Sequence, residues 1–196
     1  MIRSVTTYIS PADNCLTLTE VKSYLKVDQS AEDSLIASQL DAAESLVESY
    51  TNRKLMKGVY DLTLDSFPSG GIVLPFSPVI SVDSVSYYDE SNTLQTWTNY
   101  KVNVSANPTK IEYIDGPPAP YTDRQDKVIV RFTAGYSNSS DTATQQAAAP
   151  GQLKMAILRL CGDLYAVRQD QVREKFTSWM QFAYPERVWH FPNEND

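Results

Sequence analysis

The sequence predicts an α+β protein: an α-helical core of two N-terminal helices and one C-terminal helix, with an inserted antiparallel β-rich region and an extended C-terminal tail. Apolar residues recur at helical spacing within residues 16–55, and again after Pro150. Between these segments, residues 58–136 contain short runs of period-two alternation, separated by Gly, Pro and Asn. At 196 residues, we expect one hydrophobic core with elaborations.

The first helix is expected over residues 18–26. Thr17 and Glu20 have the spacing of a capping box, in which the hydroxyl accepts from a free backbone N–H and the carboxylate accepts from the N–H of the capping residue. Leu16, just before the cap, can pack on Val21 as a hydrophobic staple. The helix therefore has both a start signal and an anchor.

The second helix is expected over residues 31–51, because Ser30 and Asp33 repeat the capping-box spacing. Apolar side chains then follow at steps of four and three, which places them on one face of a helix. These residues are Ile36, Leu40, Ala43, Val47 and Tyr50. This face is predicted to join the core.

Another face of the second helix is acidic. It carries Asp33, Asp41, Glu44 and Glu48, and no Lys or Arg occurs between Lys26 and Arg53. Two interpretations stay open: a solvated surface, or a surface with a function.

The insertion over residues 58–136 is expected to be a meander of short strands, with a hairpin loop at residues 89–93. The predicted strands cover residues 59–65, 72–74, 79–88, 94–97, 100–104, 111–114 and 127–134. Residues 115–126 contain three prolines and several charges, so they are expected to form an exposed loop. This loop is either an inert connector or presents Tyr121 and Arg124 to a partner.

The third helix is expected over residues 150–168, because Pro150 suits a first helical turn. Its apolar face is Leu153, Ile157, Leu160, Leu164 and Val167. The preceding residues, 137–149, have the composition of a flexible linker.

The two ends of the chain are expected to lie outside the main domain, which covers residues 16–169. Residues 1–15 form an extended arm that can pack on a neighbour, since Pro11 halts a β-leaning segment. Residues 170–196 form an aromatic tail, which either contacts a partner or docks on its own chain. Within the tail, residues 188–191 are expected to be extended and able to add to a neighbour's groove or sheet edge.

Composition excludes several classes of protein. The net charge of −7 disfavours general nucleic-acid binding, which depends on Lys and Arg, but it does not disfavour passage of DNA. Cys15 and Cys161 lack metal-site spacing and are expected to be buried thiols in a reducing compartment, with a disulfide as the alternative. No signal peptide or membrane-spanning segment is recognisable, so we expect a soluble protein made in the cytosol.

We expect no catalytic, cofactor-binding or metal-binding residues. His190 is the single histidine and lies near the end of the tail, where packing is the simpler interpretation. The motifs of nucleotide-binding loops, zinc proteases and serine hydrolases are missing. An enzyme with an unrecognised carboxylate site remains an alternative.

Several segments in fixed order resemble the head-tail connector, or adaptor, family of tailed double-stranded DNA phages and gene transfer agents. They read LTLTEVKSYLKVD, EDSLIASQLDAAESLVESYTNRKL, VYDLTLDSFP, LPFSPVISVDSVSYYDE, VIVRFTAGY and AILRLCGDLYAVRQ. The resemblance covers residues 16–169, which would form the connector domain.

The resemblance implies a structural virion protein, found in the neck between the capsid portal and the tail. It implies a homo-oligomeric ring, usually of twelve copies, that binds the portal protein, extends the DNA channel and gives a docking platform for the stopper or tail-completion protein. DNA would pass through the lumen without sequence-specific binding, since an acidic or neutral wall does not hold phosphates.

On this basis we assign candidate contacts. The expected interface with the portal or a neighbouring subunit is Phe176, Trp179, Phe182, Tyr184, Arg187, Trp189, His190 and Phe191. Asp41, Glu44 and Glu48 are expected to face the channel or a subunit junction. Tyr121 and Arg124 are candidate loop contacts. The alternative is a phage carbohydrate-binding or host-binding β module, suggested by the aromatic residues Tyr87, Tyr88, Trp97, Tyr100 and Tyr113.

Overall fold

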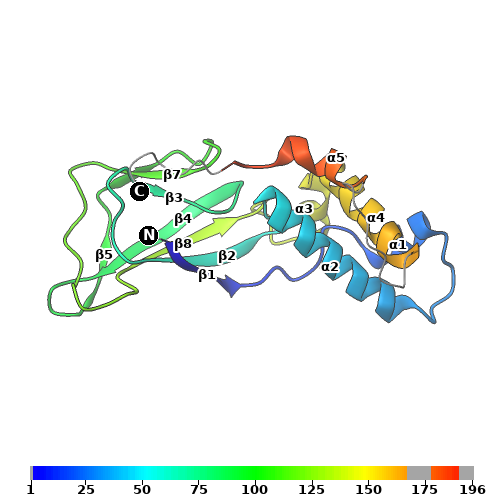
Figure 1. Cartoon of the computed structure of the whole chain (residues 1–196), viewed down its shortest axis with the longest axis horizontal. Helices are drawn as coiled ribbons and strands as arrows, with labels where there is room; N and C mark the ends of the chain where they lie inside the picture. Colours follow the sequence, from blue (N-terminus) through cyan, green and yellow to red (C-terminus); the bar gives the residue numbers. More distant parts are fainter. Residues whose placement is uncertain (1, 167–177, 190–196) are drawn as a thin grey trace.

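A computed structural model describes residues 2–166 and 178–189 of the chain. The molecule is elongated, with its strands gathered at one end and most of its helices at the other (Figure 1). The helices are α1 (Leu18–Leu25), α2 (Asp33–Thr51), α3 (Thr142–Ala148), α4 (Gly151–Ala166) and α5 (Met180–Ala183), with a 3-10 turn η1 (Tyr184–Glu186). The strands are β1 (Ile2–Ile9), β2 (Gly58–Leu64), β3 (Ile72–Val73), β4 (Val79–Tyr88), β5 (Leu94–Trp97), β6 (Tyr100–Val102), β7 (Lys110–Tyr113) and β8 (Val128–Ala134). The predicted α+β class is confirmed.

Helix α1 begins at the predicted capping box. The Thr17 hydroxyl oxygen accepts from the Glu20 N–H at 3.2 Å, and Glu20 Oε2 accepts from the Thr17 N–H at 2.7 Å. Two backbone donors at the helix start are thereby satisfied within one turn of sequence.

Helix α2 buries the predicted apolar face, with Ile36, Leu40, Ala43 and Val47 at most 3% exposed. Its predicted start was wrong, because the helix begins at Asp33 and no side chain caps it. The Asp33 carboxylate instead accepts from Lys22 Nζ of α1 at 2.5 Å. This ion pair between helices takes the carboxylate that a capping box would need.

The strands form two antiparallel sheets rather than the expected meander. The larger sheet has the order β1-β2-β8-β4-β5, and the smaller has the order β3-β7-β6. Strand β8 is last in sequence but lies in the centre, because Val128, Val130 and Phe132 are fully buried and need strands on both sides. The hairpin loop at residues 89–93 is confirmed by the pairing of β4 with β5.

The N-terminal segment contains β1, which is the edge strand beside β2 of the same chain. The expected extended conformation is therefore present, with its strand partner inside the molecule. Residues 10–15 then cross from the sheet to the helices (Figure 1).

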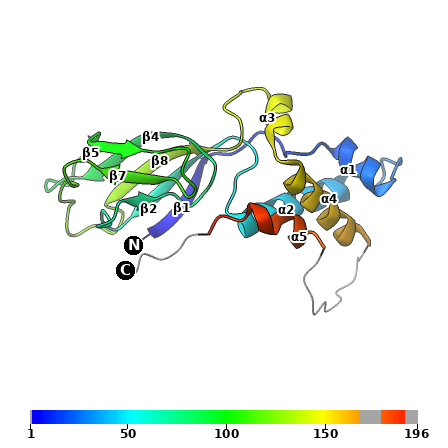
Figure 2. The same cartoon turned by 90° about the horizontal axis from the view of Figure 1, so that it is seen from above.

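The described residues form two hydrophobic cores, so the expectation of a single core was wrong. One cluster joins the helices around Ile36, Val47 and Ile157, and the other lies between the two sheets around Leu62 and Phe132. Seen from above, sheets and helices occupy opposite ends of the molecule (Figure 2). The sheets bury their apolar faces on each other, which leaves the helices to form a core of their own.

The segment predicted as a flexible linker contains helix α3, so that prediction was wrong. Asp141 caps the helix, since its carboxylate accepts from the Thr144 N–H at 2.8 Å. The alanines and glutamines of this segment are good helix formers once a cap is present. The next helix, α4, buries Leu153, Ile157 and Leu160 as predicted, whereas Leu164 is 37% exposed. Val167 lies outside the described residues.

Both cysteines are free and fully buried, as predicted. Burial raises the pKa of the Cys15 thiol, and it raises that of Cys161 to about 12. None of the helices in the described ranges is long and apolar enough to cross a membrane.

Candidate functional site

Two flanks of helix α2 carry most of the residues with a predicted function. Residues two positions apart on a helix lie about 200° apart around its axis, so they face opposite sides. Glu44 and Glu48 therefore point away from Leu46 and Tyr50. We call the first side, together with the adjacent Asp13, the acidic flank, and the second side, together with the tail residues beside it, the aromatic flank.

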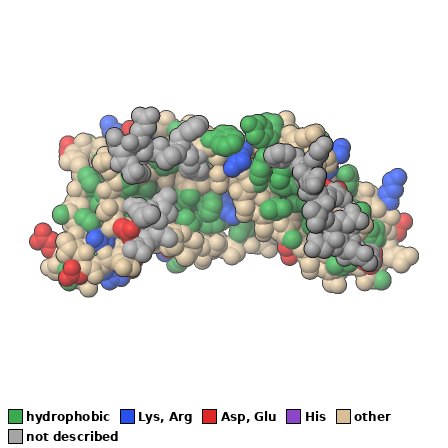
Figure 3. Space-filling view, in the orientation of Figure 1, with side chains coloured by type: hydrophobic (Ala, Val, Ile, Leu, Met, Phe, Trp, Pro, Cys, Tyr) green, Lys and Arg blue, Asp and Glu red, His purple; other side chains and the backbone are tan. Residues whose placement is uncertain are grey.

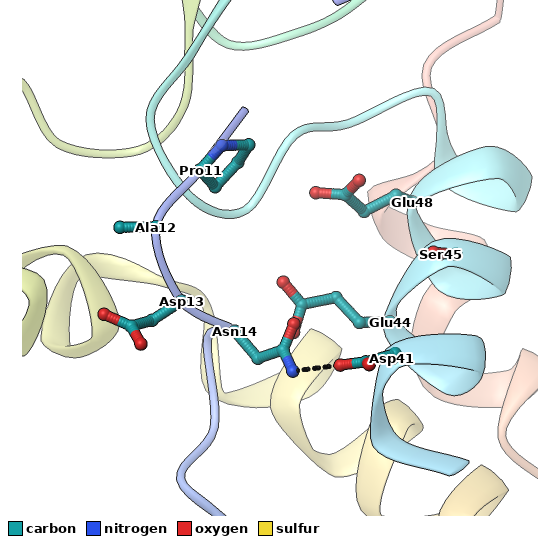
Figure 4. Close-up of a pocket in the computed structure, with 8 residues that line it drawn as sticks. All are labelled: Pro11, Ala12, Asp13, Asn14, Asp41, Glu44, Ser45 and Glu48. Atoms are coloured by element: carbon teal, nitrogen blue, oxygen red, sulfur yellow. Dashed lines mark hydrogen bonds between the residues drawn. The ribbon is translucent and has the colours of Figure 1, made fainter. Parts of the chain in front are cut away.

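The acidic flank borders a cavity of about 380 Å³ between α2 and residues 11–14 (Figure 4). It is lined by Pro11, Ala12, Asp13, Asn14, Asp41, Glu44, Ser45 and Glu48. Asn14 Nδ2 donates to Asp41 Oδ1 at 2.6 Å, and the Cys15 N–H donates to Glu44 Oε2 at 2.9 Å. These two hydrogen bonds fasten the N-terminal segment to α2.

Glu44 is only 7% exposed. Burial raises the pKa of its carboxyl to about 7, and the neighbouring charges of Glu48 and Asp41 add to this. The hydrogen bond from the Cys15 N–H acts in the opposite direction, because it favours the charged carboxylate.

Glu48 joins the helices to the sheets. Its carboxylate accepts from Lys54 Nζ at 2.6 Å and from the Leu55 N–H at 2.9 Å. Lys54 Nζ also lies 4.9 Å from the centroid of the Phe76 ring, on the β side of the junction. The charge of Glu48 is thus balanced inside the chain.

The structure brings the predicted residues Asp41, Glu44 and Glu48 to one cavity, but only Asp41 of the three is well exposed. Sequence reasoning missed Asp13 and Asn14, because no local pattern shows that residues 11–14 cross α2. The Asp13 carboxylate accepts from the Thr142 hydroxyl at 3.0 Å. In the described part of the chain, Asp13 and Asp41 therefore accept hydrogen bonds from neutral donors.

On the other side, the tail is attached to the end of α2. The Val188 N–H donates to the Thr51 carbonyl at 2.9 Å, and Asn52 Nδ2 donates to the Val188 carbonyl at 3.0 Å. Val188 is 2% exposed. This part of the tail therefore packs on its own chain.

Trp179 departs from its predicted role at a partner interface. It is 2% exposed and lies in the helical core, with its ring edge-on to Tyr50 at 5.4 Å between centroids. Phe182 packs partly buried against the same core. A large aromatic ring gains more from a core in its own chain than from a wet surface. Phe176, His190 and Phe191 lie outside the described residues.

Tyr184, Arg187 and Trp189 form the exposed part of the aromatic flank. Tyr184 is 57% exposed and Trp189 is 46% exposed, and their ring centroids lie 6.1 Å apart. The Arg187 guanidinium lies 4.3 Å from the Trp189 centroid and 4.8 Å from that of Tyr50. Hydrophobic side chains gather over α5 in the space-filling view (Figure 3).

The Arg187 guanidinium has an unsatisfied hydrogen-bond donor and no ion pair among the described residues. Its Nε atom is buried and has no hydrogen-bond partner in the described part of the chain. None of the ion pairs among the described residues includes its guanidinium. Beside it lies an apolar cavity of about 390 Å³, lined by Tyr50, Met180, Gln181 and Tyr184.

The loop residues Tyr121 and Arg124 lie at the β end of the molecule and do not join these flanks. Arg124 pairs with both carboxylate oxygens of Asp126, at 2.8 and 2.7 Å, and its guanidinium lies 3.6 Å from the Tyr88 centroid. The Tyr121 N–H donates to the Tyr88 carbonyl at 2.8 Å. The loop is fastened to the β4–β5 hairpin, and the Arg124 charge is balanced.

The strand aromatics that suggested a carbohydrate-binding module largely pack on one another. Trp97 lies 5.3 Å from Tyr113 and 5.2 Å from Phe67, between ring centroids. Tyr87 and Tyr100 belong to the same partly buried group. Core packing explains these rings. Within residues 2–166 and 178–189, no three His, Cys, Asp or Glu side chains are grouped so as to hold a metal ion.

The fold and these flanks define a class of protein: an α+β protein with two cores, whose exposed acidic and aromatic residues lie on opposite sides of one helix. A family model described as "Phage gp6-like head-tail connector protein" matches residues 15–114, just over half of the chain. The chain belongs to this family, and the predicted resemblance is confirmed.

Solved structures share the whole fold. A chain from the "Neck of empty GTA particle computed with C6 symmetry" is 21% identical, with a TM-score of 0.81, and the match covers 99% of this chain and 100% of that one. A chain from the "Neck of native GTA particle computed with C12 symmetry" is 20% identical, with a TM-score of 0.79 over 99% and 100% of the two chains. No curated protein matches the sequence.

Proposed function

We propose that this chain is a structural protein of the virion neck, in which copies form a ring, expected to have twelve members, beneath the portal. The family match over residues 15–114 carries this proposal. The full-length similarity to chains of neck particles supports it, since the fold is shared from end to end. The role is mechanical: the ring extends the DNA channel and gives the stopper or tail-completion protein a surface to dock on.

Charge supports passage of DNA without binding. The chain has 24 acidic and 17 basic residues. A ring of such chains would offer phosphates little to hold, because tight nucleic-acid binding needs Lys and Arg that displace counterions. Arg131, on the large sheet, pairs with both oxygens of the Asp61 carboxylate at 2.8 and 2.7 Å, so its charge is also balanced.

The exposed residues of the tail are proposed as partner contacts. Trp179 is not included, because it is buried in the helical core. Tyr184, Arg187 and Trp189 combine residue types that are enriched at the energetic centres of protein interfaces. They are held in place by the backbone hydrogen bonds of Val188, so a partner would meet a preformed surface.

The test is particle assembly without this protein. Deletion of the gene is expected to leave filled or empty heads that lack tails, and supply of the full-length chain is expected to restore joined particles. Electron microscopy of the particle neck would then show the chain as a ring with rotational symmetry. Normal tail attachment in the deletion strain would contradict the proposal.

A further inference from the structure

We propose that the two flanks of α2 are the two halves of the ring contact: the aromatic flank of one copy docks on the acidic flank of the next, with Arg187 directed to the cavity beside Asp13 and Asp41. This inference rests on the proposed ring and identifies the surfaces that close it. The occupant of each flank is a second copy of this chain.

Charge complementarity is the first argument. Arg187 has a buried Nε without a partner, and no ion pair among the described residues includes its guanidinium. Across α2, the carboxylates of Asp13 and Asp41 accept from the neutral donors Thr142 and Asn14. Among the described residues, one side of α2 thus carries a cation without an ion pair and the other carries carboxylates without one, and contact with a second copy would pair them.

Shape and exposure agree with this pairing. The cavity at the acidic flank, about 380 Å³, has room for an arginine side chain. Around Arg187, the rings of Tyr184 and Trp189 stay about half exposed, and Leu46 on the same side of α2 is 48% exposed. An apolar and aromatic rim around one cation is typical of an interface centre that excludes water from an ion pair.

Geometry gives the third argument. A closed ring needs a heterologous contact, in which one patch meets a different patch of the next copy. Residues two positions apart, such as Glu44 and Leu46, lie on opposite sides of α2. The two flanks therefore face away from each other, which is the arrangement that propagates head to tail.

Charge reversal in the full-length chain tests the pairing. Arg187→Glu and Asp41→Arg are each expected to raise the protein concentration needed for ring formation about tenfold or more, since each opposes like charges at the contact. The double variant, with both reversals, is expected to recover most of the loss. Lys101→Glu, on the exposed strand β6, is the matched control and should change little. Native mass spectrometry measures assembly, and circular dichroism checks the fold.

Cross-linking gives a second measurement that does not depend on affinity. Tyr184 and Ser45 are exposed, one on each flank, while both natural cysteines are fully buried. The double variant Tyr184→Cys with Ser45→Cys should form a ladder of disulfide-linked oligomers under mild oxidation, whereas each single variant should stay uncross-linked.

The outcomes separate the two proposals. Unchanged ring formation in both charge-reversal variants would overturn the pairing, and so would rings of the double-cysteine variant that give no disulfide-linked ladder. Either result would leave the proposed neck function intact. Disulfide dimers from Tyr184→Cys alone would also overturn it, because they require the aromatic flank to meet itself. A wild-type chain that stays monomeric, alone and in particles, would overturn the ring and the pairing together.

Discussion

At the scale of residues, Glu44 is the clearest conflict between burial and charge. It lies at the centre of the acidic flank, where its carboxylate accepts from the Cys15 N–H at 2.9 Å. The same residue fixes the N-terminal segment to α2. The free-energy cost of burying its carboxyl group is therefore offset by a contact between parts of the chain that are far apart in sequence. Because the folded protein shifts the pKa of Glu44, this attachment has a measurable pH dependence.

The first prediction concerns the Glu44→Gln variant. The pKa of Glu44 is raised from 4.5 to about 7, so between these values the folded protein keeps a proton that the unfolded chain has lost. The contribution of the protonated Glu44 carboxyl to the free energy of unfolding is therefore fully present below pH 4.5 and is lost as the pH rises to 7. Gln has no such loss, and its amide oxygen can still accept from the Cys15 N–H.

Glu44→Gln should accordingly be more stable than wild type by about 1–3 kcal/mol at pH 8, with little difference near pH 4.5. Urea denaturation at both pH values measures this. Glu112→Gln, an exposed carboxylate on β7, is the control for loss of one charge. Equal effects of the Glu44 substitution at the two pH values would show that burial does not control this carboxyl.

At the scale of elements, residues 179–189, which include α5, divide into a buried part and an exposed part. Trp179 and Val188 hold the segment on the helical core and on the end of α2, whereas Tyr184 and Trp189 stay accessible. Aromatic content in sequence did not separate these roles, because burial depends on where the segment meets α2 and α4.

The second prediction compares the two tryptophans. Trp179→Ala should lower the free energy of unfolding by about 3–5 kcal/mol, since it empties a fully enclosed site in the core. Trp189→Ala should change stability by about 1 kcal/mol or less, because the ring is half exposed, but it should weaken ring assembly. Thermal unfolding and native mass spectrometry report the two effects. The same loss of stability in both variants would contradict this division.

At the scale of the whole molecule, two cores must be held together where the chain passes between them. Gly135 lies at this junction after β8, where its N–H donates to the Pro78 carbonyl at 3.0 Å. Its φ of +143° and its surroundings both require glycine: an added Cβ would lie 2.8 Å from Lys57 Cα and 2.9 Å from the Met56 carbonyl oxygen. The backbone of Met56 and Lys57, just before β2, therefore leaves no room for a side chain at position 135.

The third prediction follows from this contact. Gly135→Ala should destabilise the protein by about 2 kcal/mol or more, through backbone strain and the clash with Lys57. Gly151→Ala is the matched control, because no atom lies within 4 Å of its added Cβ at the start of α4. It should be neutral or slightly stabilising. Equal melting temperatures for the two variants would show that the junction can relax.

Local patterns predicted much of the fold because their causes are local. The capping box at Thr17 and the buried face of α2 follow from spacing along one helix, and the β4–β5 hairpin follows from its loop. The resemblance to the connector family likewise came from segments in fixed order, and the family match confirmed it.

Contacts between distant residues decided the rest. The central position of β8, the separation into two cores and the burial of Trp179 depend on which elements meet in space. The sequence alone determined the periodicity of each element and the excess of acidic residues. Only the tertiary structure decided that Asp13 joins Asp41 at one cavity, and that Arg187 has no ion pair with any described residue on the other side of α2. The reason is that burial and charge pairing depend on distances that spacing along a chain does not specify.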